Sequence, residues 1–443
     1  MDPARLAQEI FDSPTRSFAV QLWNGALLPP RAPAAAKGRL KLCQPGSVAA
    51  LLPPVEEAGL VEAYLDGDFE LEGDAVGLVE ALARWEGPRR TVGLGLELAA
   101  ARIRRAFRRG DDSVRAEVRG HRHSPRRDGA AVRHHYDVSD AFYRLFLDRD
   151  MVYSCAYFQS GTESLEEAQR AKLELVCRKL DLKPGERFLD VGCGWGALLA
   201  HAARRHGAVG TGITVSQNQL AEARRLLAAA GGPAAGSVVE ADYRTLPGPP
   251  FDKVASVGMM EHVGRERLAD YFGAMWRLTR PGGLFLNHAI ADAAAESRTV
   301  PWVTRRRGGF IERYIFPDSD LVPLRLVVAA AERAGFEVRD VESLREHYAA
   351  TLCAWLSRLE EHLREAEALV GARRTRAYRL YLATSAASFR LGRISVFQLL
   401  LARRTETGRA EGLPRSRADW YAPPLAGAAE AVAVGASADR ERA

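Results

Sequence analysis

The sequence of 443 residues predicts an α/β protein in which a doubly wound parallel sheet follows a smaller N-terminal α+β domain. Strand and helix patterns alternate after about residue 135, which is typical of parallel strands joined by helices. A glycine-rich turn follows the first strand of this series, as in folds that bind ligands at strand ends. Residues 1–90 instead combine two strand patterns with two short helical ones.

The composition is that of a globular protein with a large core, because 47% of the residues are hydrophobic and 27% are charged. No stretch approaches the roughly 20 mostly apolar residues of a membrane-spanning helix, and the N-terminus lacks the apolar segment of a secretory signal. The cysteines form neither a disulfide framework nor a CxxC metal pattern; they are Cys43, Cys155, Cys177, Cys193 and Cys353. We therefore expect a reducing, cytoplasmic location and no metal site.

The N-terminal domain is expected over residues 1–90, and its first strand is predicted close to the N-terminus. Ser17–Trp23 alternates as a strand, Asn24-Gly25 is typical of a hairpin turn, and a second strand is expected near Arg39–Cys43. Two short helical patterns follow and end at Trp85.

A basic segment, expected as a helix and linker over residues 91–134, carries most of the net charge. The formal charge of the chain is +6, and residues 101–134 hold eleven Arg against four acidic residues, a local charge of +7. Helical periodicity is confined to Leu96–Phe107. Positive charge of this kind suits nucleic acids and anionic lipid surfaces alike.

The second domain, expected over residues 135–405, alternates strands and helices. Its predicted elements are the strand Arg187–Val191, a helix through His206, the strand Ala208–Val215, the helix Gln217–Ala229, and the strands Ser237–Glu240, Phe251–Val257 and Gly283–Ala289. Residues 345–403 are expected to be helical, and the tail 406–443 to be flexible.

The strongest local motif is the turn after the first of these strands, Asp190-Val191-Gly192-Cys193-Gly194-Trp195-Gly196. Backbone N–H groups in such a turn approach an anionic ligand group closely. The spacing is G-x-G-x-G and not the G-x-G-x-x-G of dinucleotide sites. A tight turn that binds nothing is the alternative. Polar residues after the next two strands agree in position, and these are Thr214, Gln219, Asp242 and Tyr243.

Two further candidates lie at the carboxyl ends of later strands. Glu261 follows the strand Phe251–Val257, and its carboxylate is expected in the ligand crevice. His262 beside it is more simply a residue at the start of a helix. His288 closes the next strand and is equally compatible with a buried core histidine.

Several motifs in one order resemble the cyclopropane-fatty-acyl-phospholipid synthase family from about His135 to Arg403. They are His135-Tyr136-Asp137, Tyr153-Ser154-Cys155-Ala156-Tyr157-Phe158, the glycine turn, Thr214–Gln219, Glu261-His262-Val263-Gly264, Tyr314-Ile315-Phe316-Pro317, and Tyr348 before Thr351-Leu352-Cys353-Ala354-Trp355. The resemblance implies a Rossmann-like class I methyltransferase fold, with S-adenosylmethionine as methyl donor. The N-terminal unit resembles the small lipid-associated domain of the bacterial enzyme.

The resemblance also implies a reaction and its residues. The cis alkene of a phospholipid acyl chain takes the methyl of S-adenosylmethionine, and the resulting cation loses a proton to bound bicarbonate as the ring closes. The bicarbonate ligands carry over to Cys155, Glu261, His288, Ile290 and Tyr348, with Cys155 and Ile290 acting through backbone groups. The cofactor-binding set is Tyr153, Ser154, Asp190, Gly192, Gly194, Gly196, Thr214, Gln219, Asp242 and Tyr243. A nucleophilic Cys155 is rejected, because transfer of a methyl from sulfonium to carbon needs no covalent enzyme intermediate.

Aromatic rings are expected to steady the cation, since ring faces carry negative charge. The candidates are Tyr136, Tyr157, Phe158 and Tyr314, and the alternative is that they are core residues. Two positions depart from the family. Ala383-Thr384-Ser385-Ala386 stands where relatives can carry a cysteine, and Ser139-Asp140 stands where many carry Gly-Asn. The second departure leaves the product open.

Three alternatives remain. The family reaction can instead end in a methylene or methyl branch; the chain can be a lipid-binding module without activity; or it can methylate nucleic acid, for which no base-stacking motif is present. We expect an anionic membrane surface with unsaturated phospholipid as the partner, peripheral association with the inner face of the cell membrane, no nucleic acid, and a homodimer.

Overall fold

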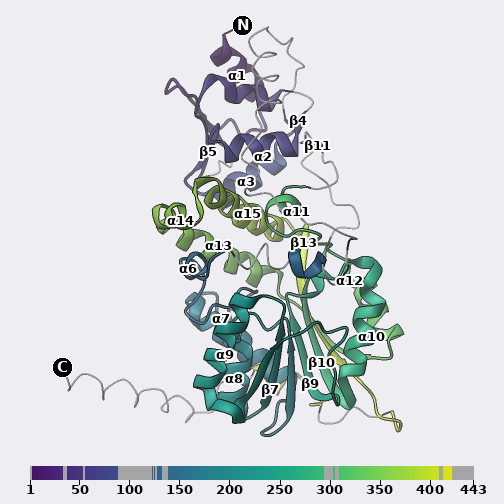
Figure 1. Cartoon of the computed structure of the whole chain (residues 1–443). Helices are drawn as coiled ribbons and strands as arrows, with labels where there is room; N and C mark the ends of the chain where they lie inside the picture. Colours follow the sequence, from purple (N-terminus) through teal and green to yellow (C-terminus); the bar gives the residue numbers. More distant parts are fainter. Residues whose placement is uncertain are drawn as a thin grey trace, which may run out of the picture.

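The computed structural model describes residues 2–32, 37–52, 55–87, 122, 124, 127–131, 138–293, 303–304, 309–408 and 413–421. The predicted helix 96–107, most of the basic segment, Tyr136 and about two thirds of the predicted flexible tail lie outside these residues. Figure 1 shows an elongated arrangement, with the N-terminal elements at one end and the large sheet at the other.

The N-terminal unit is built on a four-stranded sheet of order β2-β1-β3-β5. Its strands are β1 (Ala19–Gln21), β2 (Leu27–Leu28), β3 (Arg39–Leu42) and β5 (Phe69–Glu72), and its helices are α1 (Pro3–Phe11), η1 (Pro45–Leu51), α2 (Glu57–Leu65) and α3 (Ala75–Arg84). The hairpin turn is present, with Gly25 at φ +86°.

The strand that the hairpin turn leads into is β2, and the strand predicted near Arg39–Cys43 pairs parallel with β1. The strand β2 was not predicted, because two residues are too few to show alternation.

The second sheet has seven strands in the order β12-β13-β10-β9-β6-β7-β8. The strands are β6 (Arg187–Val191), β7 (Val209–Thr214), β8 (Gly236–Glu240), β9 (Phe251–Val257), β10 (Thr279–Asp292), β12 (Glu337–Ser343) and β13 (Ile394–Ala402). The pairings from β8 to β10 are parallel, as predicted, and β13 runs antiparallel between β10 and β12. Helices lie on both faces of this sheet, so the doubly wound α/β class is confirmed.

The prediction of helix throughout residues 345–403 is wrong at its end. Helices occupy Arg345–Glu361, Leu363–Val370 and Ala372–Arg390, labelled α13, α14 and α15, and the chain then forms β13. The run Val396–Ala402, apolar except for Gln398, is buried on both faces of the sheet, and periodicity alone does not distinguish such a run from a buried helix.

The remaining elements cover the sheet or join the two units. On the side of β7 and β8 are α7 (Leu165–Lys179), α8 (Ala197–His206), α9 (Gln217–Gly231) and η3 (Gly232–Ala235); α10 (Leu268–Leu278) and α12 (Leu324–Arg333) pack on each other. The short elements are β4 (Val55–Glu56), α6 (Asp140–Arg144), η4 (Met260–His262), η5 (Arg265–Arg267), β11 (Val303–Thr304), α11 (Phe310–Tyr314) and α16 (Ala418–Tyr421). No helix among the described residues is both long and apolar enough to cross a membrane.

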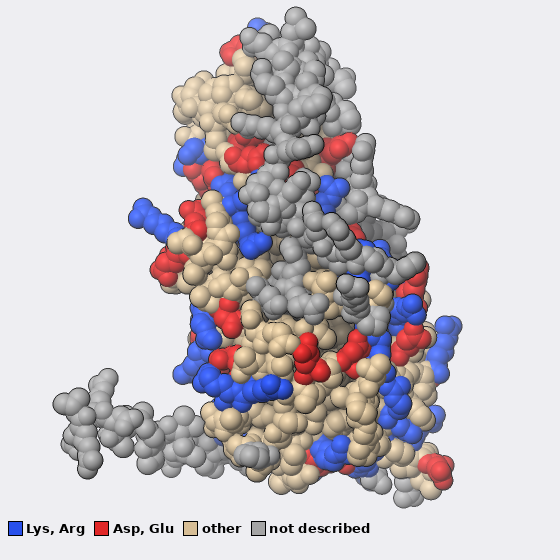
Figure 2. All heavy atoms as spheres, viewed as in Figure 1, with Lys and Arg blue, Asp and Glu red and all other residues tan. Residues whose placement is uncertain are grey.

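The helical layer α13–α15 lies between the sheet and the N-terminal unit (Figure 1). One apolar core runs through it, since Phe11 and Trp85 belong to the same buried cluster as Trp355 and Tyr378. Charged groups add to this contact: Figure 2 shows acidic and basic side chains close together at this level. The two units are therefore joined by a shared core as well as by polar contacts.

Candidate active site

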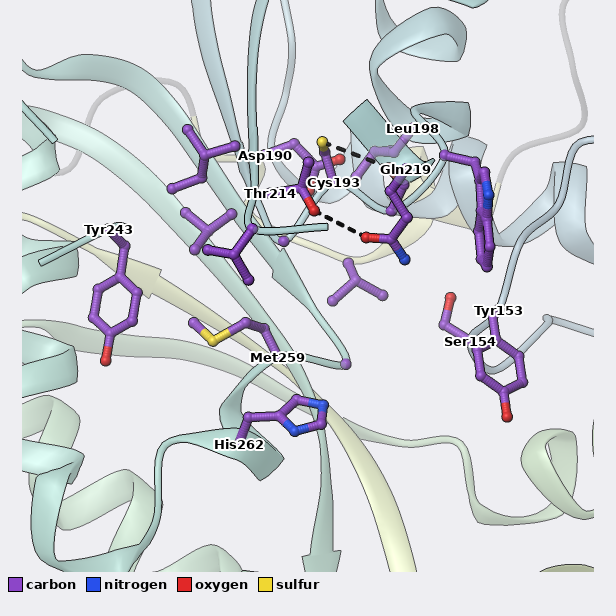
Figure 3. A pocket seen from close by; sticks show the side chains of 18 of the residues that line it. Tyr153, Ser154, Asp190, Cys193, Leu198, Thr214, Gln219, Tyr243, Met259 and His262 are labelled. Atoms are coloured by element: carbon purple, nitrogen blue, oxygen red, sulfur yellow. Dashed lines mark hydrogen bonds between the residues drawn. The ribbon is translucent and has the colours of Figure 1, made fainter. Parts of the chain in front are cut away.

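A pocket opens at the carboxyl ends of β6, β7 and β9, where open α/β sheets bind their ligands. Its lining includes every residue of the predicted cofactor set except Gly196, the third glycine of the turn. Figure 3 shows Tyr153 and Ser154 on one side of this pocket and Tyr243 on the other, with Met259 between them. The structure thus brings the predicted cofactor residues into one region.

The glycine turn owes its shape to positive φ angles. Gly196, at φ +90°, starts α8, and a Cβ there would lie 2.9 Å from the Cα of Ala223. Gly194, at φ +55°, is different, because a Cβ there would meet no atom within 4 Å. Gly196 is thus required by packing, whereas Gly194 leaves its backbone open to a ligand.

Asp190 lies at the end of β6 and is buried, with 2% of its surface exposed. Burial raises the pKa of its carboxyl to about 7, and the positive charge of Lys172 lowers it in part. Burial also lowers the pKa of Lys172 to about 8, and its Nζ donates a hydrogen bond to Ser154 Oγ at 2.7 Å. Lys172 lines the pocket but was not predicted, because a lysine in a helical pattern gives no sign that it is buried.

The polar residues after β7 and β8 differ in the hydrogen bonds and ion pairs that they already make within the protein. Thr214 Oγ1 donates to Gln219 Oε1 at 2.9 Å, which holds the amide at the pocket (Figure 3). Asp242 instead accepts hydrogen bonds from Arg244, with Nε at 2.8 Å from Oδ1, and Arg244 also pairs with Asp128 at 3.0 Å. The Asp242 carboxylate therefore lies at the pocket with its charge already balanced.

Glu261 and His288 each present a buried polar atom without a hydrogen-bond partner among the described residues. Glu261 Oε1 accepts a hydrogen bond from the N–H of Ile290 at 2.7 Å, and Oε2 has no hydrogen-bond partner among the described residues. His288 Nδ1 lies 3.1 Å from Gln398 Nε2. The other ring nitrogen of His288, its Nε2, has no hydrogen-bond partner among the described residues. Buried polar atoms are nearly always bonded, so this pair points to a polar ligand.

Burial sets the protonation of both groups near neutral pH. It raises the pKa of Glu261 to about 7, while the hydrogen bond from Ile290 opposes the shift. It lowers the pKa of His288 well below the usual value, with Lys172 and Lys179 adding to this effect. His288 is therefore neutral, and in the tautomer in which the Gln398 amide donates to Nδ1, the imidazole proton is on Nε2. The site offers one imidazole donor and one carboxyl close to half-protonation.

Cys155 and Tyr348 join this pair through the backbone of Leu344. Cys155 Sγ lies 3.8 Å from Leu344 O, which also accepts from the N–H of Tyr348 at 3.0 Å. The N–H of Leu344 in turn donates to Val396 O, and Val396 is the neighbour of Ile290 in the sheet. These backbone contacts connect the Cys155 segment and the start of α13 to β13 and β10. Burial raises the pKa of the Cys155 thiol, which argues against its use as a nucleophile.

Of the predicted aromatic candidates, Tyr136 lies outside the described residues, and the other three are not among the described residues that line the cofactor pocket. Tyr157 stacks on His347, with ring centroids 4.7 Å apart, and the N–H of Phe158 donates to His347 Nδ1. The hydroxyl of Tyr314 donates to Glu62 of the N-terminal unit. His262, expected only to start a helix, does line the pocket.

Other aromatic residues gather beside Tyr153 instead. They are Phe142, Tyr143, Phe146, Trp195, Trp355 and Tyr378, with neighbouring ring centroids 4.9–6.5 Å apart. Their aromatic character was the only sequence signal for them. It does not distinguish rings that surround a ligand from rings that pack in the hydrophobic core.

Comparison with known proteins shows which family the chain resembles. Residues 123–399 match the family model described as mycolic acid cyclopropane synthetase. The chain is 41% identical over 370 residues to a probable fatty acid methyltransferase of Pseudomonas putida, which covers 83% of this chain and 87% of that one. The solved cyclopropane synthase MmaA2 from Mycobacterium tuberculosis is 35% identical with a TM-score of 0.58, covering 62% of this chain and 97% of that one. The solved mycolic acid cyclopropane synthase CmaA1, complexed with SAH and CTAB, is 36% identical at the same TM-score and coverage.

Proposed function

Because the chain belongs to the mycolic acid cyclopropane synthetase family, we propose that it converts the cis double bond of a phospholipid acyl chain into a cyclopropane. The family and the fold make it an S-adenosylmethionine-dependent methyltransferase of lipid chains. The phospholipid substrate, the cyclopropane product and the bicarbonate base are the proposal. The observation that carries it is the pair of buried, unpartnered atoms on Glu261 and His288.

The pocket residues fit the cofactor. When bound, S-adenosylmethionine supplies an electrophilic methyl group on a sulfonium. The open backbone at Gly194 suits the close approach of its carboxylate, and Asp190 suits its ammonium group. Gln219 and Asp242 line the same pocket, and we assign them to the ribose and the adenine. Alignment by these residues matters because an alkene is a weak nucleophile.

The second cluster fits a small oxyanion. Bound bicarbonate would supply the base that takes the proton lost on ring closure. The His288 Nε2–H would donate a hydrogen bond to an anion oxygen, and the Glu261 carboxylate would accept one from the bicarbonate hydroxyl. The N–H of Ile290 already donates to Glu261, so we assign it the role of fixing the carboxylate. Tyr348 and the backbone of Cys155 complete the set.

A second product is supported by the similarity to a fatty acid methyltransferase. In that reaction the proton is lost from a different carbon, which leaves a methylene or methyl branch. The same residues would serve, because a base is needed in both cases. Mass does not separate the two products, since a cyclopropane and a methylated alkene each add CH₂.

The test is lipid analysis of a bacterial host that makes no cyclopropane lipids and expresses this chain. We expect phospholipid acyl chains heavier by CH₂, with the upfield proton signals of a cyclopropane ring in the NMR spectrum. Methyl-branch or methylene signals in their place would overturn the cyclopropane and establish the second product.

Two variants test the proton-removal assignment in purified protein. Glu261→Gln and His288→Ala should each lower turnover about 100-fold or more, because general base steps contribute about 10²–10⁴-fold. Their affinity for S-adenosylhomocysteine, measured by calorimetry, should stay within about threefold of wild type. Glu266→Gln, at an exposed position nearby, is the matched control and should keep full turnover. Wild-type rates in either site variant would contradict the assignment.

A further inference from the structure

Four side chains with metal-binding atoms gather on α7 and α8, outside the cofactor pocket. We call them the thiol–imidazole cluster, and they are Glu174, Cys177, His201 and His206. Glu174 and Cys177 are three residues apart and share one face of α7. His201 lies on α8, and His206 is its last residue. The packing of α7 on α8 brings the two pairs together.

The donor atoms are close enough to share one ion. One ligand atom each of Cys177, His201 and His206 lies within 4.8 Å of the other two. Glu174 Oε2 is 2.8 Å from His201 Nε2 and 3.2 Å from His206 Nε2. Ligand atoms of a tetrahedral zinc site lie about 3.3–3.8 Å apart, as bond lengths of 2.0–2.3 Å dictate. Small side-chain rotations would therefore bring the atoms of Cys177, His201 and His206 to these distances, and Glu174 Oε2, beside both imidazoles, is the candidate for a fourth ligand.

We propose that the thiol–imidazole cluster binds one divalent transition-metal ion of the zinc class. One thiolate, two imidazoles and one carboxylate form a borderline-soft set, which suits Zn²⁺ and not Mg²⁺ or Ca²⁺. Four protein ligands close the coordination shell, so the ion is structural and joins α7 to α8. Because α8 ends at His206, its negative dipole end also favours a cation there.

Access and charge fit this assignment. The two histidines and Glu174 are 16–23% exposed, whereas Cys177 is buried, so an ion would enter from the imidazole side. Arg178 pairs with the other carboxylate oxygen, Oε1, at 2.8 Å and leaves Oε2 for the ion. Binding releases the thiol proton to solvent. Burial raises the pKa of Cys177, and the bond to the ion has to offset that cost.

The competing explanation is that Glu174 simply bonds two histidines and no ion binds. The test uses the full chain, freed of metal with a chelator and then titrated with Zn²⁺ by calorimetry. Metal content is measured after gel filtration. We expect one equivalent of Zn²⁺ per chain, and a thiolate-to-metal charge-transfer band when Co²⁺ replaces it. Less than a tenth of an equivalent in the wild type would overturn the proposal.

Matched variants locate the ion. Cys177→Ser and His206→Gln should each weaken Zn²⁺ binding by at least about tenfold, since even outer-shell partners contribute 10–100-fold. Cys43→Ser and His362→Gln remove the same groups elsewhere and should bind as wild type. Circular dichroism of each apo variant checks its fold, and His206→Gln serves if the buried Cys177→Ser fails to fold. Unchanged affinity in a folded His206→Gln or Cys177→Ser variant would overturn the site.

Discussion

Asp190 and Lys172 show how burial prepares two single residues for a charged ligand. Both are buried beside the glycine turn, and each pKa is shifted toward neutrality by burial. Each therefore sits close to losing its charge when the pocket holds only solvent. An ammonium group placed against Asp190 would favour its ionised form again.

The affinity for S-adenosylmethionine should therefore rise with pH. Burial raises the pKa of Asp190 to about 7, so the carboxylate is about one-tenth ionised at pH 6 and three-quarters ionised at pH 7.5. If the ionised form binds the ammonium group, affinity should increase about eightfold over this range. Calorimetry at both pH values measures it.

Asp190→Asn provides the control for this pH dependence. The variant should bind more weakly at pH 7.5 and lose most of the rise, because no carboxyl remains to ionise. Glu240→Gln, at an exposed position at the end of β8, should keep the wild-type profile. A rise that persists unchanged in Asp190→Asn would assign the titration to another group.

The candidate site was predictable where a residue type and its place at a strand end agree. Asp190, Glu261 and His288 lie in or just after strands that the sequence marks clearly, so their place at one edge of the sheet was predictable. Lys172 and Gln398 were not predicted, because each lies on an element whose burial is set by tertiary packing. The thiol–imidazole cluster was missed for a related reason: its two halves lie on different helices, and no short motif joins them.

At the scale of elements, α15 holds the N-terminal unit through a row of arginines. Arg376 is the central one: Nε donates to Tyr64 O at 2.7 Å, a second nitrogen donates to Phe69 O at 2.6 Å, and a third pairs with Glu70. Its guanidinium also lies 4.3 Å from the centre of the Tyr64 ring. Arg373 and Arg379 make similar contacts on either side, with Glu62, Asp66 and Leu71.

Arg376→Ala should lower the free energy of unfolding by about 2–3 kcal/mol. The variant leaves two backbone carbonyls of the N-terminal unit without their donor, and hydrogen bonds to charged groups contribute about 1.5–3 kcal/mol each. Urea unfolding followed by circular dichroism measures the change. Arg364→Ala, on the exposed face of α14, should change stability by less than about 0.5 kcal/mol. Equal effects of the two substitutions would show that the contacts of Arg376 are not stabilising.

The fold was predictable for elements that carry a regular pattern between clear turns, as from β6 to β9. The prediction failed for β13, because its mostly apolar sequence follows three helices without a strong helix-breaking signal. Gly392 is the one signal there: it has φ +67° after the end of α15 and marks the change of direction. The pairing of β4 with β11 was also hidden, because two-residue strands almost 250 residues apart are joined only by the tertiary fold.

At the scale of the whole molecule, the charge is distributed unevenly along the chain. Basic and acidic residues are interspersed over the described part of the face in Figure 2. The excess of +7 falls instead in residues 101–134, most of which lie outside the described residues. The proposed substrate is a membrane lipid, and we propose that this basic segment binds the enzyme to the membrane surface. Each basic residue near an anionic surface contributes about 1 kcal/mol.

Replacing Arg104, Arg105, Arg108 and Arg109 with Gln should therefore weaken binding to anionic vesicles by at least about tenfold, since 1.4 kcal/mol corresponds to a factor of ten. Sedimentation with phosphatidylglycerol vesicles at low and high salt measures both the affinity and its salt dependence, which should also fall. The control replaces four exposed arginines elsewhere, Arg265, Arg325, Arg333 and Arg364, with Gln. Both variants carry a net charge of +2 in place of +6, so a difference between them reports the position of the charge and not its amount. Equal sedimentation of the first variant and the wild type would show that the basic segment serves another purpose.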